Sequence, residues 1–500
     1  MKISLPKSTQ NWITLIGAMI ALIAVSMIIF LFTISAFLSN THTYLGLVIY
    51  ILLPAVMIIG LILIPIGMLI TVRRREGKEP TTGVWPRVDL NEKRHRNAFF
   101  IFSIGTTLLV FASAVGSYEV FHFTESVEFC GTTCHTVMKP EYTAYQNSAH
   151  ARVACVACHV GTGADWYVRS KLSGAYQVYA VIADVYPRPI PTPVHNLRPA
   201  RETCEQCHWP QKFYSRKLRV EDHYLGNEEN TEWEIQLIMK IGAEEHAKGL
   251  SEGIHWHINP DVRVEYITTD ERRQEIPWVR FTNLKTNESK VYIDEENPID
   301  EEMVKPENMR VMDCMDCHNR PSHDYKTPIN FVNLAISKNP EIAELPELKY
   351  TAVDLCSEEY GSTDSAMQAI ENGLKTFYEE NYPEVLEEKS ELFKQAVIDI
   401  QTAFSQNIFP EMKVRWDAYP NNIGHMNFNG CFRCHNDRHT SDDGQVISRE
   451  CNACHLITAQ GTKDDMQLAM TGQALEFMHP DGEEDWKDSL CSDCHAGVNP

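Results

Sequence analysis

The chain has 500 residues, which is long enough for two or three domains. Its 67 acidic and 45 basic side chains give a formal net charge of −22. This charge argues against a nucleic-acid partner, whose phosphates are held by clustered Lys and Arg. An acidic surface favours basic partners, although it also serves simple solubility.

Three long apolar segments come first in the chain. They cover Trp12 to about Leu38, Tyr44 to Val72, and Ala98 to Tyr118. Each exceeds the roughly 18–20 residues that cross a bilayer core. A cleavable signal peptide is the alternative for the first segment, but its apolar stretch is too long and a second span follows directly. We therefore predict an anchor domain of residues 1–118, with transmembrane helices at about 12–38, 44–72 and 98–118.

The basic residues predict how these spans are oriented. The loop between the first two spans carries no charge, whereas Lys2 and Lys7 precede the first span. The loop between the second and third spans holds eight basic residues, Arg73, Arg74, Arg75, Lys78, Arg87, Lys93, Arg94 and Arg96. Cytoplasmic loops carry such an excess. We expect a bacterial cytoplasmic (inner) membrane protein with a cytoplasmic N-terminus, spans in contact with membrane lipid, and a periplasmic domain after Tyr118.

Fourteen of the fifteen cysteines form seven pairs, and each pair is followed at once by His. Six pairs have two residues between the cysteines, and the first has three. The motifs are Cys130/Cys134/His135, Cys155/Cys158/His159, Cys204/Cys207/His208, Cys314/Cys317/His318, Cys431/Cys434/His435, Cys451/Cys454/His455 and Cys491/Cys494/His495.

This repeated pattern is typical of covalent haem attachment. Two thiols at this spacing can add to the two vinyl groups of one haem, and the adjacent His then reaches the iron. Zinc would require pairs of cysteine pairs, which does not explain a His after every one. We predict seven haem c groups, the longer first motif included. Haem attachment is extracytoplasmic in bacteria, in agreement with the predicted orientation.

The regions after the anchor are predicted from these motifs and from periodicity. Residues 119–210 hold the first three motifs. Residues 211–340 hold the fourth motif and a small β insert, because apolar and polar residues alternate between Val262 and Asp294. Residues 341–410 are helical and acidic, and residues 411–500 hold the last three motifs. The expected fold class is a multihaem cytochrome c, mostly α and irregular, with three N-terminal transmembrane helices.

Each iron has a sixth coordination position, which electron-carrying cytochromes usually fill with a second His. The preferred candidates are His150, His223, His323, His425, His439 and His479. His255 and His257 share one face if they lie in a strand, so that one of them is a further candidate, as is His195. Met138 follows His135 closely and is either a thioether ligand or an ordinary buried Met. Cys356 has no motif and is expected to be a small buried hydrophobe.

The stretch from Phe129 to Ala180 resembles the NapC/NirT family of membrane-anchored, quinol-oxidising multihaem cytochromes. The matching features are an anchor span that leads straight into Phe129-Cys130, the Met after the first motif, His150 before the second, and Cys158-His159-Val160 followed by Trp166 and Lys171. The resemblance covers roughly the third span and the first two or three motifs.

The resemblance implies that menaquinol is oxidised at the first haem and that its electrons pass outward to periplasmic c-type cytochromes in anaerobic respiration. It further implies that Met138 is an axial ligand and that Lys171 lies beside the quinol. The expected activity is therefore that of a quinol dehydrogenase. Two alternatives stay open: a terminal reductase with one open haem, and an electron-transfer subunit without its own quinol site.

Overall fold

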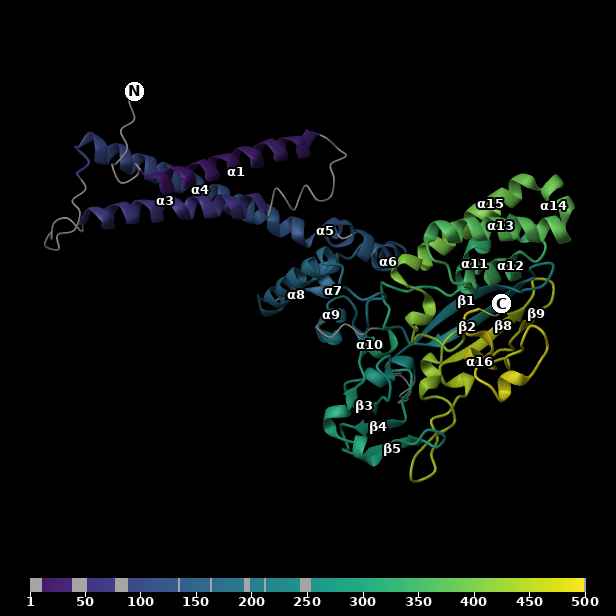
Figure 1. Cartoon of the computed structure of the whole chain (residues 1–500). Helices are drawn as coiled ribbons and strands as arrows, with labels where there is room; N and C mark the ends of the chain where they lie inside the picture. The colour runs from purple at the N-terminus through teal and green to yellow at the C-terminus, as the bar shows by residue number, and fades with distance from the viewer. Residues whose placement is uncertain are drawn as a thin grey trace. The chain divides into compact units, whose positions relative to one another are not determined.

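The computed structural model of the chain describes residues 11–37, 52–76, 89–133, 135–161, 164–192, 198–210, 213–242 and 253–498. It divides into two compact units, Met1–His135 and Thr136–Pro500, and each is described by itself (Figure 1). This division falls directly after the first cysteine motif, which ends at His135. The domain boundaries expected from the sequence stay predictions.

The first unit contains three long helices, α1 (Trp12–Phe37), α3 (Leu53–Glu76) and α4 (Lys93–Glu125), followed by the short α5 (Val127–Thr132). Two segments, Trp12–Leu31 and Leu53–Thr71, are long and apolar enough to cross a membrane. The third expected span lies within α4 and stays a prediction. Leu38 and residues 44–51 of the expected spans lie outside the described residues.

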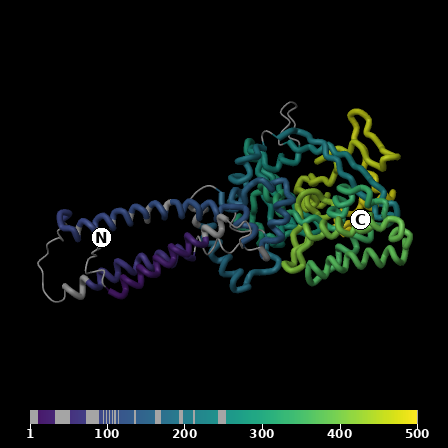
Figure 2. The backbone as a smooth tube through the Cα atoms, turned by 90° about the horizontal axis from the view of Figure 1, so that it is seen from above, coloured from purple at the N-terminus to yellow at the C-terminus, as the bar shows by residue number. Residues whose placement is uncertain are grey.

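Helices α1 and α3 pack side by side, as Figure 1 and Figure 2 show, and small residues lie at their contact. A Cβ atom added to Gly17 would lie 2.7 Å from the carbonyl oxygen of Gly60, and one added to Gly60 would lie 2.7 Å from the Ala21 nitrogen. The Thr14 hydroxyl donates to the Ile64 carbonyl across the same contact at 3.2 Å. Glycine at both positions therefore permits the close backbone approach that stabilises helix pairs in lipid.

The second unit contains two antiparallel sheets. The first has the order β1-β2-β8-β9, and the second has the order β6-β3-β4-β5-β7. Their strands are β1 (Arg216–Tyr224), β2 (Glu232–Lys240), β3 (Val262–Ile267), β4 (Trp278–Asn283), β5 (Ser289–Asp294), β6 (Arg310–Val311), β7 (His439–Thr440), β8 (His455–Gly461) and β9 (Met466–Leu468).

Strands β3, β4 and β5 lie in the range where the alternating pattern predicts strands. Val264 and Tyr266 of β3 pack with Ile276 and Val279 in a small apolar core. In both sheets a C-terminal strand pairs with a strand from the middle of the chain, β8 with β2 and β7 with β5. The sheets therefore bring the fifth and sixth motifs back onto the central part of the sequence.

The largest apolar core belongs to a helical segment, drawn in green beside β1 in Figure 1. It is built from α11 (Pro328–Lys338), α12 (Leu348–Ser357), α13 (Thr363–Asn381), α14 (Pro383–Glu388) and α15 (Ser390–Asn407). The side chains of Thr327 and Ser362 accept hydrogen bonds from amides of the first turns of α11 and α13. Cys356 is fully buried in this core.

The remaining helices are short, and most of them carry cysteine motifs or lie next to them. They are α6 (His135–Gln146), α7 (Cys155–His159), α8 (Ala164–Ile182), α9 (Ala200–Cys204), α10 (Cys314–Cys317), α16 (Cys491–His495), and the 3-10 helices η4 (Ile254–Ile258), η5 (Glu301–Met303), η6 (Pro306–Asn308), η7 (Pro340–Glu344), η8 (Pro410–Met412), η9 (Trp416–Ala418), η10 (Gly430–Arg433), η11 (Cys451–Ala453) and η12 (Asp485–Lys487).

Lys349 makes the stability of the helical core depend on pH. Its side chain is fully buried, and its ammonium group donates to the Ile329 carbonyl at 3.2 Å and to the Asn333 side chain. Burial lowers the pKa of Lys349 to about 7. Between that value and its unfolded pKa of about 10.4, the unfolded chain binds the extra proton, so stability rises with pH at about 1.4 kcal/mol for each pH unit.

We therefore expect Lys349→Met to raise Tm near pH 7 and to flatten the rise of Tm between pH 7 and pH 10. Thermal denaturation followed by circular dichroism in this pH range measures both effects. Lys375→Met removes an exposed Lys from α13 and is the matched control, which should keep the slope of the parent protein. An unchanged slope in Lys349→Met would contradict the assignment.

Candidate haem-binding sites

The cysteine motifs fold into single helical turns. In the third, fourth and fifth motifs, the amide of the motif His donates to the carbonyl of the first Cys, at 2.8 Å for His208, 2.8 Å for His318 and 3.1 Å for His435. This turn holds two thiols and one imidazole close together, as covalent haem attachment requires. In the first motif, Cys130 lies in α5, whereas Cys134 and the side chain of His135 lie outside the described residues.

The two cysteines of the seventh motif both lie in α16 but differ in exposure. Cys491 is half-buried, whereas Cys494 is exposed to solvent. Burial raises the pKa of the Cys491 thiol, and the charges of Cys451 and Cys494 add to this effect. The sequence assigns both cysteines to one haem, and this assignment stays a prediction for both, as it does for the other motifs.

Six motif histidines each face one histidine from outside the motifs. Two imidazoles that bind one metal from opposite sides, through bonds of about 2 Å, have ring centroids roughly 6 Å apart. The observed centroid separations fit an iron in every pair. They are 6.1 Å for His159–His323, 6.1 Å for His208–His150, 6.2 Å for His318–His255, 5.9 Å for His435–His257, 6.2 Å for His455–His425 and 5.9 Å for His495–His479.

Hydrogen bonds at Nδ1 fix the tautomer of most partner histidines. A carbonyl oxygen can only accept, so the Nδ1 that faces it carries the proton and Nε2 keeps its lone pair for a metal. Such contacts join Nδ1 of His150 to Pro321 O at 3.0 Å, of His323 to Glu141 O at 3.0 Å, of His255 to Ile241 O at 2.6 Å and of His257 to Ile254 O at 2.8 Å. The Nδ1 of His479 faces a carboxylate oxygen of Asp481 at 2.5 Å.

Burial keeps several of these rings neutral, which is the form that binds metals. Desolvation, together with a smaller effect of the neighbouring motif histidine, lowers the pKa of His323 and of His425 to about 4. The pKa of His159 is also lowered by burial. At neutral pH these imidazoles are therefore already in the neutral form that coordinates iron.

Two of the preferred candidates do not face a motif histidine in the part of the chain that the structure describes. His439 is fully buried, and its two ring nitrogens contact Asn436 Oδ1 at 2.9 Å and Ile276 O at 2.7 Å. His223 places Nδ1 3.3 Å from the side-chain nitrogen of Asn333. His195 lies outside the described residues.

His255 and His257 take the places beside the fourth and fifth motifs. The sequence left one of them open as a ligand, on the condition of a strand in which both share a face. They lie instead in the 3-10 helix η4, which has three residues per turn. Residues two apart then point in different directions, so His255 faces His318 and His257 faces His435. The His-x-His spacing is visible in the sequence, but it separates the two rings only in a 3-10 turn, which the sequence does not predict.

The motifs from the second to the seventh follow one another in space in the order of the sequence. Thiols of successive motifs lie near enough for the charge of one to affect the pKa of the next. These neighbours are Cys158 with Cys207, Cys204 with Cys314, Cys317 with Cys431, Cys431 with Cys454, and Cys451 with Cys491. The six histidine pairs are therefore arranged as one continuous series.

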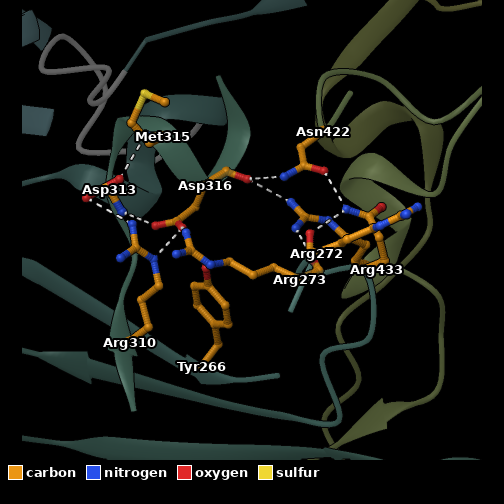
Figure 3. Close-up of polar contacts among 10 residues, drawn as sticks. Tyr266, Arg272, Arg273, Arg310, Asp313, Met315, Asp316, Asn422 and Arg433 are labelled. Atoms are coloured by element: carbon orange, nitrogen blue, oxygen red, sulfur yellow. Dashed lines mark hydrogen bonds and ion pairs between the residues drawn. The ribbon is translucent and has the colours of Figure 1, made fainter. Parts of the chain in front are cut away.

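A buried carboxylate fixes the fourth motif in place (Figure 3). Asp316, one of the two residues between Cys314 and Cys317, has a side chain that is only 1% exposed. Its Oδ1 accepts from the Tyr266 hydroxyl at 2.5 Å and from Arg310 Nε at 2.6 Å, and Arg273 lies 3.3 Å away. Tyr266 belongs to β3 and Arg310 to β6, so the carboxylate ties the motif to the second sheet.

The same position of the fifth motif reaches back to the fourth. Arg433, between Cys431 and Cys434, donates from its guanidinium to the Asp316 carbonyl at 2.9 Å and to the Arg273 carbonyl at 2.7 Å. Figure 3 shows Arg433 and Asn422 together at this carbonyl, to which Asn422 donates at 3.0 Å. The residues between the cysteines thus hold the fourth and fifth motifs beside each other.

We expect Asp316→Ala to destabilise the second unit by about 2–3 kcal/mol, because it leaves the half-buried Arg310 and Arg273 and the buried Tyr266 without their carboxylate partner. Thermal denaturation followed by circular dichroism measures the loss. Asp493 occupies the same place in the seventh motif, where it is exposed and only caps α16. Asp493→Ala should therefore cost about 1 kcal/mol. Equal losses in the two variants would show that burial of Asp316 does not matter.

The two residues implied by the family resemblance lie on different helices of the second unit. Met138 is partly buried in α6 and Lys171 is partly buried in α8. Beside Lys171, α8 carries large apolar side chains at helical spacing that remain exposed: Leu172 at 68%, Tyr176 at 66%, Tyr179 at 60% and Ile182 at 80%. Such a stripe is typical of a surface that meets an apolar partner.

The cysteine motifs, the facing histidines and the apolar N-terminal helices define a membrane-anchored cytochrome of the c type. Residues 92–189 match the N-terminal region of the NapC/NirT cytochrome c family. Over 497 residues the chain is 43% identical to the cytochrome c-type protein ImcH of Geobacter sulfurreducens, which covers 98% of this chain and 95% of that protein. The chain belongs to the NapC/NirT cytochrome c family. No solved structure matches it.

Proposed function

We propose that the chain is a menaquinol-oxidising cytochrome c with seven haems, which resides in the bacterial cytoplasmic membrane and passes electrons to periplasmic c-type cytochromes in anaerobic respiration. The full-length similarity to ImcH supports electron transfer as the role. The observation that carries the proposal is the series of six histidine pairs in sequence order. Haem c, when bound, supplies a one-electron carrier at each motif.

The histidine pairs favour electron transfer over reduction of a bound substrate. Each pair presents two imidazoles at a separation that places one on either side of an iron, so no coordination position is left for a substrate. We assign His323, His150, His255, His257, His425 and His479 as partners of the second to seventh motifs. At the first motif we assign Cys130 and Cys134 to covalent attachment, and His135 or Met138 to the iron.

The quinol site is assigned to Lys171 and the exposed face of α8. A Lys ammonium can donate to a quinol oxygen, and menaquinol carries an isoprenoid tail that requires apolar surface. The stripe of Leu172, Tyr176 and Tyr179 next to Lys171 provides such a surface. Three membrane spans with a cytoplasmic N-terminus would place α8 on the outer side, where the two quinol protons are released to water.

The ligand assignment predicts which variants bind carbon monoxide. The dithionite-reduced parent protein should bind none at the second to seventh motifs, because both axial positions of these six irons are filled. His257→Ala should open one position and give a carbon monoxide difference spectrum of one haem per chain. His223→Ala is the control and should resemble the parent protein, since His223 faces Asn333 rather than a motif histidine. Binding by the parent protein at one of these six irons would instead favour the terminal reductase.

The quinol assignment predicts the rate of haem reduction. A reduced, soluble menaquinol analogue mixed with the purified full-length protein should reduce its haems in a stopped-flow experiment. We expect Lys171→Gln to slow this reduction at least about tenfold, a loss of roughly 1.4 kcal/mol in transition-state stabilisation, with unchanged reduction by dithionite.

The control for that experiment is Lys139→Gln, which removes an exposed Lys from α6. It should leave the rate as in the parent protein. If the parent protein is not reduced on a turnover timescale, the chain is an electron-transfer subunit that depends on a separate quinol-oxidising partner.

A further inference from the structure

We propose that Asp481 is a positioning residue that lowers the reduction potential of the haem at the seventh motif below that of the haem at the sixth. The proposal rests on the ligand assignment made for the proposed function, but not on menaquinol as the electron donor. It concerns the hydrogen bonds that the partner histidines make on the side that faces away from the iron.

A tight turn places the Asp481 carboxylate against His479. The amide of Gly482 donates to the His479 carbonyl at 2.9 Å, with Pro480 in the second position of the turn. Gly482 has a φ of +80°, a conformation that glycine adopts without strain. Asp481 Oδ1 lies 2.5 Å from His479 Nδ1 and also accepts from the Glu483 amide at 2.8 Å. The carboxylate is therefore held in one orientation by the local backbone.

The pair at the sixth motif has the opposite arrangement. Nδ1 of His425 and Nδ1 of His455 are both buried and find no hydrogen-bond partner in any other described residue. The histidines that face the second to fifth motifs have acceptors of intermediate strength, because their Nδ1 groups face neutral carbonyl oxygens. Consecutive motifs at the C-terminal end thus carry the strongest and the weakest Nδ1 acceptors in the series.

The acceptor at Nδ1 controls how strongly Nε2 donates to a metal. A carboxylate draws the Nδ1 proton toward itself, which gives the ring more imidazolate character and makes Nε2 a stronger donor. A stronger donor stabilises the oxidised iron more than the reduced iron, so the reduction potential falls. Without an acceptor, the ring donates less and the potential stays higher. The Asp481 side chain is 55% exposed, so solvent screens its charge, but the direct hydrogen bond remains.

The experiment compares Asp481→Asn with the parent protein, both as the haem-loaded full chain, in a spectroelectrochemical titration. Asn keeps an oxygen acceptor but removes the carboxylate charge that draws the proton. We expect one titrating component, with the amplitude of one haem, to move to a more positive potential. The expected change in its reduced-to-oxidised ratio at fixed potential is about tenfold, or 59 mV for one electron. One low-spin electron paramagnetic resonance signal should change its g values.

Glu483→Gln is the matched control, because it removes the same charge two residues away and keeps the contact between His479 and Asp481. It should shift the reduction potential of the same component by less than about a third of the shift in Asp481→Asn. Equal shifts in the two variants, or no shift in Asp481→Asn, would overturn the proposal.

His479→Ala tests the ligand assignment separately. It should convert one low-spin haem into one that binds carbon monoxide, and an unchanged low-spin spectrum would remove the basis of the inference. Failure of menaquinol oxidation would leave these potentials and spectra as expected, so the two proposals fail independently.

Discussion

In the proposed ligand set, the irons of the second to seventh motifs each draw two imidazoles from different segments of the chain, and this requirement shapes the second unit. His323 comes to the second motif while His150, close to that motif in sequence, comes to the third. The two segments also bind each other directly, since His150 faces the Pro321 carbonyl and His323 faces the Glu141 carbonyl. The large apolar core lies elsewhere, among α11 to α15. Axial ligation and these backbone contacts therefore supply the order that apolar packing supplies in other domains.

The residues between the cysteines of a motif are free of any role in haem attachment, and two of them serve the tertiary structure. Asp316 joins the fourth motif to strands β3 and β6 through Tyr266 and Arg310, and Arg433 of the fifth motif binds the Asp316 backbone. A charge buried with this many partners is costly to leave unpaired but well fixed in position. Fixed spacing between neighbouring motifs matters for electron transfer, because the transfer rate depends on the distance between carriers.

The sequence predicted what depends on local chemistry. The Cys and His spacing of each motif follows from the size of one porphyrin, the apolar N-terminal segments from bilayer thickness, and the strands β3 to β5 from their alternation. The pairing of imidazoles did not follow, because it depends on tertiary structure. In the sequence, nothing distinguishes His439 and His223 from the other candidate ligands. In the structure, however, their rings contact Asn436 and Asn333. His255 and His257 both face motifs because η4 has three residues per turn, and no local pattern around them predicts that turn.

The facing histidine comes before its motif in the sequence at every pair except one. In the third to seventh motifs, the facing histidine precedes the motif: His150 before His208, His255 before His318, His257 before His435, His425 before His455 and His479 before His495. At the second motif the partner is His323, which is synthesised only after the fourth motif. With the proposed ligands and orientation, the periplasmic part of the chain emerges from its N-terminal end, so maturation of the second centre would wait until His323 had emerged. Truncation before His323 would leave that centre incomplete while the third had its full set of side chains.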